Sequence, residues 1–488
     1  MLIASSRVLR IYSTMSTIAG YKYQPPVARN MKELDRSFFV TKIPLCAVQF
    51  PNPSDISFFA KNYKDSILRV PRIPHVVRLG QVADSIPSNN SKTLSCDNGI
   101  VFKGVLLNDS ISTPDEISEK LSQEARSFLK ESGAKVISYE YVLDYNFWRA
   151  EEILRAVLPA EFLDEIPTGF TVTGHIAHLN LRQEFKPYSS IIGQVILDKN
   201  NKIETVVDKV SSIATKFRTF PMKVIAGRDD DLVVTQKESN CTFKFDFSKV
   251  YWNSRLHTEH ERLVKEYFQT GQVVCDVFAG VGPFAIPAGK KNVIVLANDL
   301  NPESFVYLKQ NISLNKVEKL VKSFNLDGAE FINRSLGLLK EWRSEETSST
   351  ITLEPKINKY RKKPKTENQA KSQVVQVPIP FNIHHFVMNL PDSSITFLHN
   401  FVGLYSGHDE VKDLPWIHVH CFEKYANDED PSMEELHKRV HKRILAEFNA
   451  SAQVLSFDDL SFHLVRKVSP TKPMFCVSFQ LPKLVAYC

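Results

Sequence analysis

Several features that mark other protein classes are missing from this 488-residue chain. Its seven cysteines form no CxxC pair and their number is odd, so we expect no disulfide framework and no metal site, and a reducing compartment. No stretch approaches the ~18 consecutive apolar residues of a membrane helix, and no internal repeat is evident. These absences leave a soluble chain of two or three domains, because 488 residues are too many for one core.

Acidic side chains are missing from the first 32 residues, where Arg7 and Arg10 occur among serines and apolar residues. An Arg-bearing, acid-free segment that can form a helix is typical of a mitochondrial presequence. A disordered tail is the alternative. Met15 offers a second start that would shorten this segment. We therefore expect product in the mitochondrial matrix and the cytoplasm, with the nucleus as a further location.

The charge balance is mildly basic, with a net charge of +6 and a pI near 8.7. This value is compatible with a nucleic-acid partner but does not establish one.

The order of apolar runs predicts three domains after the N-terminal segment. Residues 33–108 are predicted to form a small α+β domain and residues 120–250 a middle α+β domain, in which 169–181 and 188–200 resemble strands. From 251 to 488, short apolar runs alternate with helical segments, which predicts a mostly parallel doubly wound sheet that ends in an antiparallel hairpin. The Lys-rich residues 341–378 are predicted to be a disordered insertion.

A glycine-containing turn follows the first apolar run of this last domain. In VVCDVFAGVGPF the predicted strand ends at Asp276, and Gly280 and Gly282 allow the backbone to approach a ligand closely. The dinucleotide fingerprint GxGxxG is not met, because Phe284 and Ala285 stand where its last glycine is expected. The turn thus disfavours NAD, and a purely structural turn is the alternative.

Two further acids follow the next two predicted strands. Asp299 lies roughly 20 residues beyond the glycines, the spacing at which a carboxylate reaches ribose hydroxyls. Asn301 and Pro302 then begin a helix. Asp327 ends the third run, FNLDG. Each acid alone could be a helix cap, but three in this order favour a nucleoside ligand, S-adenosylmethionine, over NAD.

A fourth run, FVMNLPD, ends in an Asn-x-Pro turn at Asn389. Amino-directed methyltransferases often hold a target nitrogen with such an amide. Methylation of a ring nitrogen that bears a proton, such as guanine N1, also needs a base and a cation near the developing charge. Glu259 can be that base if burial raises its pKa, and Arg255 or Arg218 can be the cation.

The stretch VYWNSRLHTEHERLV leaves two interpretations of Arg255 and Glu259 open. They could form an i,i+4 ion pair worth ~0.3–0.5 kcal/mol on a helix surface, or they could belong to a site. Helical spacing places Glu259 at the border of the apolar stripe and His260 inside it, where it could be core or a cofactor contact. His418, His420 and Cys421 resemble a metal cluster, but alternation in a strand explains them better.

Taken together, these motifs resemble the eukaryotic and archaeal tRNA (guanine(37)-N1)-methyltransferases. The matching segments, in chain order, are GHIAHLNLR, IIGQVILDKN, FRTFPMKVIAG, FDFSKVYWNSRLHTEHERL, CDVFAGVGPFAIP, ANDLNPES, FNLDG and VMNLP. The resemblance implies a class I (Rossmann-like) methyltransferase domain preceded by two smaller domains. It also implies methyl transfer from S-adenosylmethionine to N1 of guanosine 37 in tRNA, by a monomer that binds no membrane.

The same resemblance assigns roles to single residues. Glu259 matches the general base, Arg218 and Arg255 match cations near the target base, and Asn389 matches the positioning asparagine. The residues that match cofactor contacts are His260, Asp299, Leu300, Asp327, Gly328 and Asn389, alongside Asp276, Gly280 and Gly282 from the turn.

Two other functions remain open at this point. The related aminocarboxypropyl transferase of wybutosine synthesis uses the same cofactor, but that family tends to have GIGYF where this chain has GVGPF. A non-catalytic tRNA-binding protein on the same fold is the second alternative.

Overall fold

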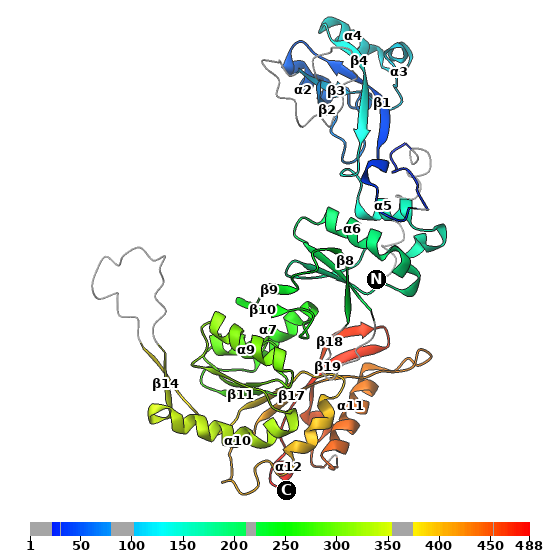
Figure 1. Cartoon of the computed structure of the whole chain (residues 1–488). Coiled ribbons are helices and arrows are strands. Elements are labelled where there is room, and N and C mark those ends of the chain that lie inside the picture. Colours follow the sequence, from blue (N-terminus) through cyan, green and yellow to red (C-terminus); the bar gives the residue numbers. More distant parts are fainter. Residues whose placement is uncertain (1–21, 30, 80–101, 211–220, 354–373, 452) are drawn as a thin grey trace, which may run out of the picture. The chain divides into compact units, whose positions relative to one another are not determined.

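The computed structural model describes residues 22–29, 31–79, 102–210, 221–353, 374–451 and 453–488. The chain forms two compact units, one from Met1–Gly169 with Leu181–Asn201 and one from Phe170–Asn180 with Lys202–Cys488. No helix in the described ranges has the length and apolar character needed to cross a bilayer. Figure 1 shows the elements of each unit along the chain.

The first unit contains a four-stranded antiparallel sheet in the order β2-β3-β1-β4. Its strands are β1 (Thr41–Gln49), β2 (Val76–Leu79), β3 (Phe102–Leu106) and β4 (Lys135–Leu143). Its principal helices are α2 (Pro53–Asn62), α4 (Gln123–Glu131), α5 (Ala150–Val157) and α6 (Ser189–Lys199). Because β4 pairs with all nine residues of β1, the boundary predicted between 108 and 120 is wrong.

Helix α6 occupies a segment for which the sequence predicted a strand. Its buried residues Ile191, Ile192, Val195 and Ile196 recur at helical spacing. Their β-branched side chains favoured the strand prediction, and tertiary packing of this apolar face overrides that local preference. The predicted middle domain 120–250 is therefore divided between the two units.

The second unit is built on a seven-stranded sheet in the order β13-β12-β11-β16-β17-β19-β18. Its strands are β11 (Val273–Asp276), β12 (Ile294–Asn298), β13 (Val321–Phe324), β16 (His385–Met388), β17 (Trp416–Phe422), β18 (Ser461–Ser469) and β19 (Lys472–Gln480). The first five are parallel, and β18 and β19 form the predicted antiparallel hairpin. Strands β11 and β12 are buried throughout, as expected for a sheet covered on both faces.

Helices and smaller sheets complete this unit. The helices are α7 (His257–Glu266), α8 (Ala285–Lys290), α9 (Pro302–Leu314), α10 (Gly328–Glu345), α11 (Met433–Glu447) and α12 (Lys483–Ala486). One smaller sheet joins β5 (Thr171–Thr173), β6 (Ile176–Leu179), β7 (Thr205–Lys209) and β8 (Met222–Gly227), and a second joins β9 (Val233–Glu238) and β10 (Cys241–Asp246).

Two predicted disordered segments differ in part from the structure. The insertion predicted at 341–378 begins inside α10, and β14 (Thr350–Leu353) pairs with β15 (Val375–Pro378), while 354–373 lie outside the described residues. Near the N-terminus, Tyr23 donates a hydrogen bond to Asp109 at 2.9 Å. The core of the predicted presequence, residues 1–21, lies outside the described residues.

Candidate functional site

Helix α7 presents Glu259 to the interior rather than to solvent. Only 2% of the residue is exposed. Both of its carboxylate oxygens are held by Arg262, whose Nε and Nη2 donate at 2.7 and 2.8 Å. Nε2 of His420, on β17, lies 2.8 Å from the Oε1 atom of Glu259. The carboxylate is therefore the centre of a buried charged network.

This network sets the charges of its members. Burial would raise the pKa of Glu259, but hydrogen bonds from His420 and Arg262 outweigh it and hold that pKa well below its usual range. Burial likewise opposes a charge on His420, whereas Cys476 and Glu259 raise the pKa of its imidazole to about 10. The sequence-based expectation that burial raises the pKa of Glu259 is wrong for this geometry, because the partners were not foreseen.

Three side chains form a row under Glu259 on neighbouring strands. In the antiparallel register, Cys476 of β19 stands opposite His420 of β17 and also opposite His463 of β18. Directly opposed residues point to the same face of a sheet. The side-chain donor atoms of Glu259, His420 and Cys476 lie within 4.8 Å of one another. Because the Arg262 guanidinium already neutralises Glu259, we interpret this group as a proton-binding network rather than a metal site.

Arg255 does not pair with Glu259. Its guanidinium is exposed and donates to the Thr171 hydroxyl at 3.1 Å. The ion pairs that Glu259 makes within the described residues are with Arg262, His420 and, at 3.6 Å, His463. The i,i+4 ion-pair interpretation is therefore wrong, and so is the idea that Arg255 holds the carboxylate.

A second guanidinium lies near Arg255. Arg466, on β18, has its pKa lowered by burial and by the positive charge of Arg255. Two like charges in proximity favour an anionic partner. Arg218, the other predicted cation, lies outside the described residues.

The acids that follow the first two strands meet at one edge of the sheet, as predicted for parallel strands. Asn298, the last residue of β12, donates to the carbonyls of Val277 and Leu326 at 3.1 Å each and so ties the ends of β11, β12 and β13 together. The Asp299 carboxylate accepts hydrogen bonds from the amides of Gly280 at 2.8 Å and Asn301 at 2.9 Å. Burial raises the pKa of Asp299 to about 6.

Asp276 is fully buried at the end of β11, and the Phe278 amide is the only backbone donor close enough to lower its pKa, without forming a hydrogen bond of good geometry among the described residues. Burial, followed by repulsion from Asp299, raises its pKa to about 8. A buried carboxyl group without donors is costly unless a ligand or proton satisfies it.

The two glycines of the turn have different functions. Gly282 has φ +99°, and a Cβ there would lie 2.8 Å from Ile286. Gly280 has φ +55°, and a Cβ there would meet no atom within 4 Å. Gly282 is thus required by packing, whereas Gly280 faces open space beside Asp299.

The third strand end contributes less chemistry than the sequence suggested. Asp327 is exposed and caps α10 by accepting from the Ala329 amide at 2.9 Å. Gly328 is buried, and a Cβ there would lie 2.7 Å from Phe278. The carbonyl of Leu300 accepts from Asn325 at 3.1 Å. The structure shows Asp327 as a helix cap through one carboxylate oxygen, and its predicted contact with the cofactor stays a prediction.

Asn389 follows β16 at the point where the strand order reverses between β11 and β16. Ligands of doubly wound sheets bind at such switch points. The Oδ1 atom of Asn389 is buried and has no partner within the described part of the chain. The last pair of the β16–β17 register is Met388 with Val419, and Asn389 and His420 are the next residues along the two chains. Strand register therefore connects the asparagine to the Glu259 network.

His260 is buried as its helical position predicted. Its Nδ1 atom lies 2.6 Å from the Glu238 carboxylate, and its ring packs edge-on against Phe284 at a centroid distance of 4.8 Å. The same Phe284 ring lies 5.8 Å from the ring of His420.

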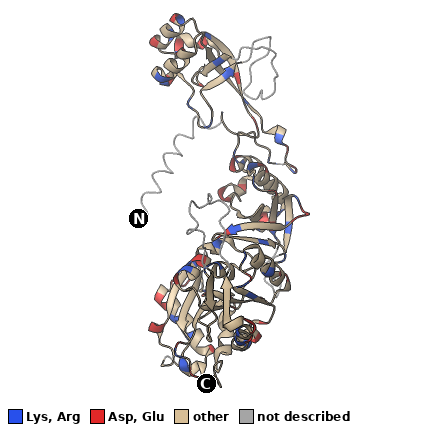
Figure 2. Ribbon diagram, turned by 90° about the vertical axis from the view of Figure 1, so that its left-hand side faces the viewer, with Lys and Arg blue, Asp and Glu red and all other residues tan. Residues whose placement is uncertain are grey.

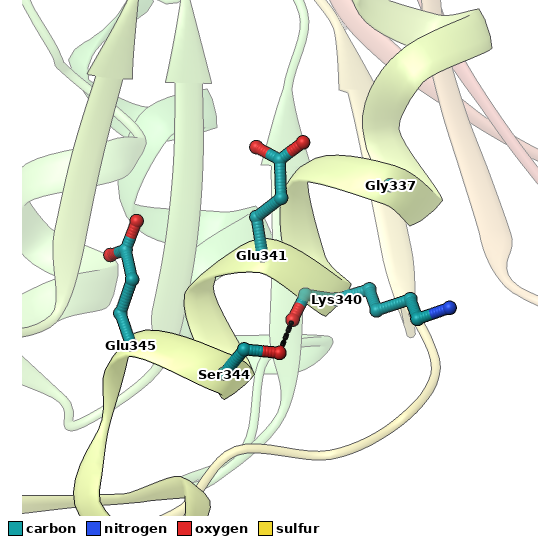
Figure 3. A pocket seen from close by; sticks show the side chains of 5 residues that line it. All are labelled: Gly337, Lys340, Glu341, Ser344 and Glu345. Carbon is teal, nitrogen blue, oxygen red and sulfur yellow. Dashed lines mark hydrogen bonds between the residues drawn. The ribbon is translucent and has the colours of Figure 1, made fainter.

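One hollow of the surface lies away from these residues. It is lined by Gly337, Lys340, Glu341, Ser344 and Glu345, all on α10 (Figure 3). Gly337 is nine residues beyond the start of α10, or about 14 Å along the helix.

Sequence reasoning missed Arg262, Cys476 and His463, and it assigned His420 only to a strand. The Glu259–Arg262 pair has the i,i+3 spacing of a helical ion pair and could have been found. The other three come from strands more than 150 residues away in sequence from Glu259, and strand register alone brings them together.

Comparisons with known proteins show the family to which the chain is similar. Residues 234–337 match the model of the TRM5/TYW2 methyltransferase domain, and residues 150–230 match that of the TYW2 N-terminal domain. The tRNA (guanine(37)-N(1))-methyltransferase of Saccharomyces cerevisiae is 61% identical over 484 residues, which cover 97% of each chain. The Candida albicans (strain SC5314) protein of the same name is 49% identical and covers 96% of this chain and 99% of its own.

Two solved structures share the fold. Trm5b from Pyrococcus abyssi is 21% identical with a TM-score of 0.51, and the alignment covers 89% of this chain and 98% of that one. The complex of aTrm5 with tRNALeu is 17% identical with a TM-score of 0.54, covering 90% and 100%. At these identities both structures support the Rossmann-like fold alone.

Proposed function

The chain belongs to the tRNA (guanine(37)-N(1))-methyltransferase family, and we propose that Glu259 is the general base of its reaction. The enzyme transfers a methyl group from S-adenosylmethionine to N1 of guanosine 37 in tRNA. The observation that carries the assignment of Glu259 is its contact with His420, which follows the β16–β17 register on one strand as Asn389 follows it on the other, at the switch point of the sheet.

The residues at the sheet edge fit S-adenosylmethionine. Gly280 leaves room for a close approach, Asp299 keeps lone pairs for ribose hydroxyls, and the unpartnered oxygens of Asp276 and Asn389 can accept from donors. When bound, the cofactor supplies the methyl carbon, and its sulfur takes the electrons of the broken C–S bond.

The residues of the chain then handle the proton. Guanosine N1 is an edge atom used in pairing, so the base must leave its stack to reach the site. Asn389 orients the base, and Glu259 removes the N1 proton as the N–C bond forms. A weakly basic carboxylate suffices because proton removal runs together with N–C bond formation, so that no fully deprotonated base has to form. Arg255 and Arg218 support the negative charge that spreads to O6.

The tRNA backbone requires positive surface, which net charge alone does not locate. Figure 2 shows basic and acidic residues interspersed along the ribbon. We infer that the neighbouring cations Arg255 and Arg466 contact a phosphate or the target base.

The test uses unmodified tRNA with G or A at position 37, labelled S-adenosylmethionine and identification of the digested product. Labelled 1-methylguanosine from the G substrate alone is expected. An aminocarboxypropyl product would instead support the wybutosine pathway enzyme, whose family shares the matched domain model. No product at all would support a non-catalytic tRNA-binding protein.

The role of Glu259 is tested by Glu259→Gln, which should lower the single-turnover rate by roughly 10²–10⁴, the usual contribution of a general base. Glu261→Gln is a matched control, because Glu261 is exposed on the same helix. Glu259→Asp and affinity measurements for both substrates separate lost chemistry from lost folding. An unchanged rate in Glu259→Gln would refute the assignment.

The chain's location and assembly complete the proposal. Alternative starts at Met1 and Met15 would divide the product among the mitochondrial matrix, the cytoplasm and the nucleus. In each location the protein would be a monomer that binds no membrane. A C-terminally tagged gene with both starts tests the division. Tagged product confined to the cytosol would contradict it.

A further inference from the structure

Glu259 must lose a proton after every turnover, and its burial blocks direct exchange with solvent. The residue is 2% exposed. Arg262, whose guanidinium binds both oxygens of the carboxylate, cannot accept a proton at physiological pH. His420 is fully buried, so it offers no direct route to water. The proton therefore needs another acceptor that touches both Glu259 and the solvent.

We propose that His463 is the proton exit of the site. Its imidazole takes the proton that Glu259 has removed from the substrate and releases it to water. This inference rests on the proposed role of Glu259 as the base. Nε2 of His463 lies 3.6 Å from Oε2 of Glu259, and the His463 side chain is 45% exposed. His463 thus bridges the buried carboxylate and the surface.

Strand register explains why His463 occupies this place. Strand β18 is the outer strand of the seven-stranded sheet. His420, Cys476 and His463 form a row across β17, β19 and β18, so the row runs from the interior to the edge. The 3.6 Å separation is slightly longer than a hydrogen bond. Rotation of the exposed imidazole closes it, as often happens when a catalytic site binds its substrate.

The surrounding charges favour transfer in this direction. The groups that face His463 are Arg262, Glu259 and Glu266 on α7, His420 on β17 and Cys476 on β19. Burial, with Arg262, lowers the pKa of His463, which keeps the imidazole neutral and able to accept. The pKa of Glu259 lies well below its usual range. A proton therefore moves downhill from carboxyl to imidazole, and then to water.

The step is balanced without a co-reactant. The O–H bond of protonated Glu259 breaks, and its electron pair stays on the carboxylate, which regains its negative charge. The proton forms an N–H bond at Nε2 of His463. The resulting imidazolium gives up a proton from a ring nitrogen to water, which restores neutral His463.

The experiment compares the first turnover with steady-state turnover of the full chain on unmodified tRNA. In His463→Gln the first turnover should keep its wild-type rate, because Glu259 can still accept one proton. Steady-state turnover should fall roughly tenfold, less than the 10²–10⁴ of a direct proton transfer. Free imidazole should restore the steady-state turnover of this variant. The acid limb that His463 gives to the pH profile of wild-type steady-state turnover should be absent from the profile of the variant.

His257→Gln is the matched control, because His257 is exposed on α7 and bonds to the Ser254 carbonyl. It should change neither phase. Unchanged steady-state turnover in His463→Gln would refute the role of His463 in proton release. An equal loss of rate in the first turnover and in steady-state turnover, without rescue by imidazole, would refute it too. Glu259→Gln separates the two proposals. If it keeps the wild-type first turnover, the proposed base fails; if it is slow while His463→Gln behaves as wild type, only the exit fails.

Discussion

His418 and His420 are two residues apart on the same strand and are equally buried, yet their surroundings keep His418 neutral and make His420 positively charged. The ring nitrogens of His418 lie 2.8 Å from the Ser478 hydroxyl and 3.1 Å from Nδ1 of His385. Burial, with repulsion from His385, holds the pKa of His418 well below its usual value. Burial opposes a charge on His420 too, but Cys476 and Glu259 raise its pKa to about 10.

The difference shows that burial alone does not decide whether a histidine serves structure or chemistry. His418 belongs to a network of neutral groups that ends at Gln272 through His385. His420 faces a carboxylate, and its own Nδ1 atom has no partner among the described residues. The neutral network is saturated, whereas the charged one is incomplete and lies beside the switch point of the sheet.

The largest expected effect comes from removing the cation that completes the charged network. Arg262→Gln leaves the Glu259 carboxylate buried beside His420 without its bidentate partner. Breaking a buried ion pair costs about 3–5 kcal/mol. The unfolding free energy of this unit should fall by that amount in urea, followed by tryptophan fluorescence, since Trp252, Trp342 and Trp416 all lie in it.

Arg439→Gln is the control for this prediction. Arg439 pairs with Glu435 at 2.7 Å on α11, where both side chains are largely exposed. Such pairs contribute ~0–1 kcal/mol. Equal losses in the two variants would show that the Glu259 network is not a buried charged cluster, and the contrast with His418 would then disappear.

The sequence predicted the residues at the edge of the sheet better than it predicted the partners of Glu259. Asp276, Asp299 and Asn389 stand at the carboxyl ends of three neighbouring parallel strands, β11, β12 and β16, and parallel pairing brings such residues to one edge of the sheet. The burial of Glu259 also agrees with its predicted position at the border of the apolar stripe of the helix. The partners of Glu259 were not found, since His420 and Cys476 meet it only through the register of β17 and β19. Local sequence does not encode that register.

The same reason explains the errors in the fold. The pairing of β4 with β1 joins residues from 86 (Gln49 and Lys135) to 102 (Thr41 and Leu143) positions apart, so the boundary between 108 and 120 could not be located from composition. At α6, β-branched residues favoured a strand although their spacing was helical. The helix-cap hydrogen bond of Asp327 depends on the position of the Ala329 amide, and the cofactor contact of Asp327 stays a prediction.

A smaller effect is expected from disrupting the neutral network. His418→Leu removes the partner of Ser478 and of His385 and leaves two polar groups buried without it. An unsatisfied buried group costs about 1–3 kcal/mol. The urea midpoint should fall accordingly, while the single-turnover methylation rate of the folded variant stays at the wild-type value. A rate loss as large as that of Glu259→Gln would mean that His418 takes part in the chemistry.

The last prediction concerns the pH dependence of stability, in which the two histidines should have opposite signs. The pKa of His420 is raised from its ordinary value of 6.5 to about 10, so its contribution to stability is fully present below pH ~6.5 and is lost as the pH rises toward 10. The pKa of His418 is lowered, so its contribution is present above pH ~6.5 and is lost as the pH falls.

The measurement is urea unfolding from pH 5 to 10. The difference in unfolding free energy between wild type and each variant cancels the contributions of other titrating groups such as Asp276. The difference for His420→Gln should shrink above pH ~6.5, and that for His418→Leu should shrink below it. If both differences shrink in the same direction, the two networks do not differ in charge. The contrast between structural and chemical histidines on β17 would then be wrong.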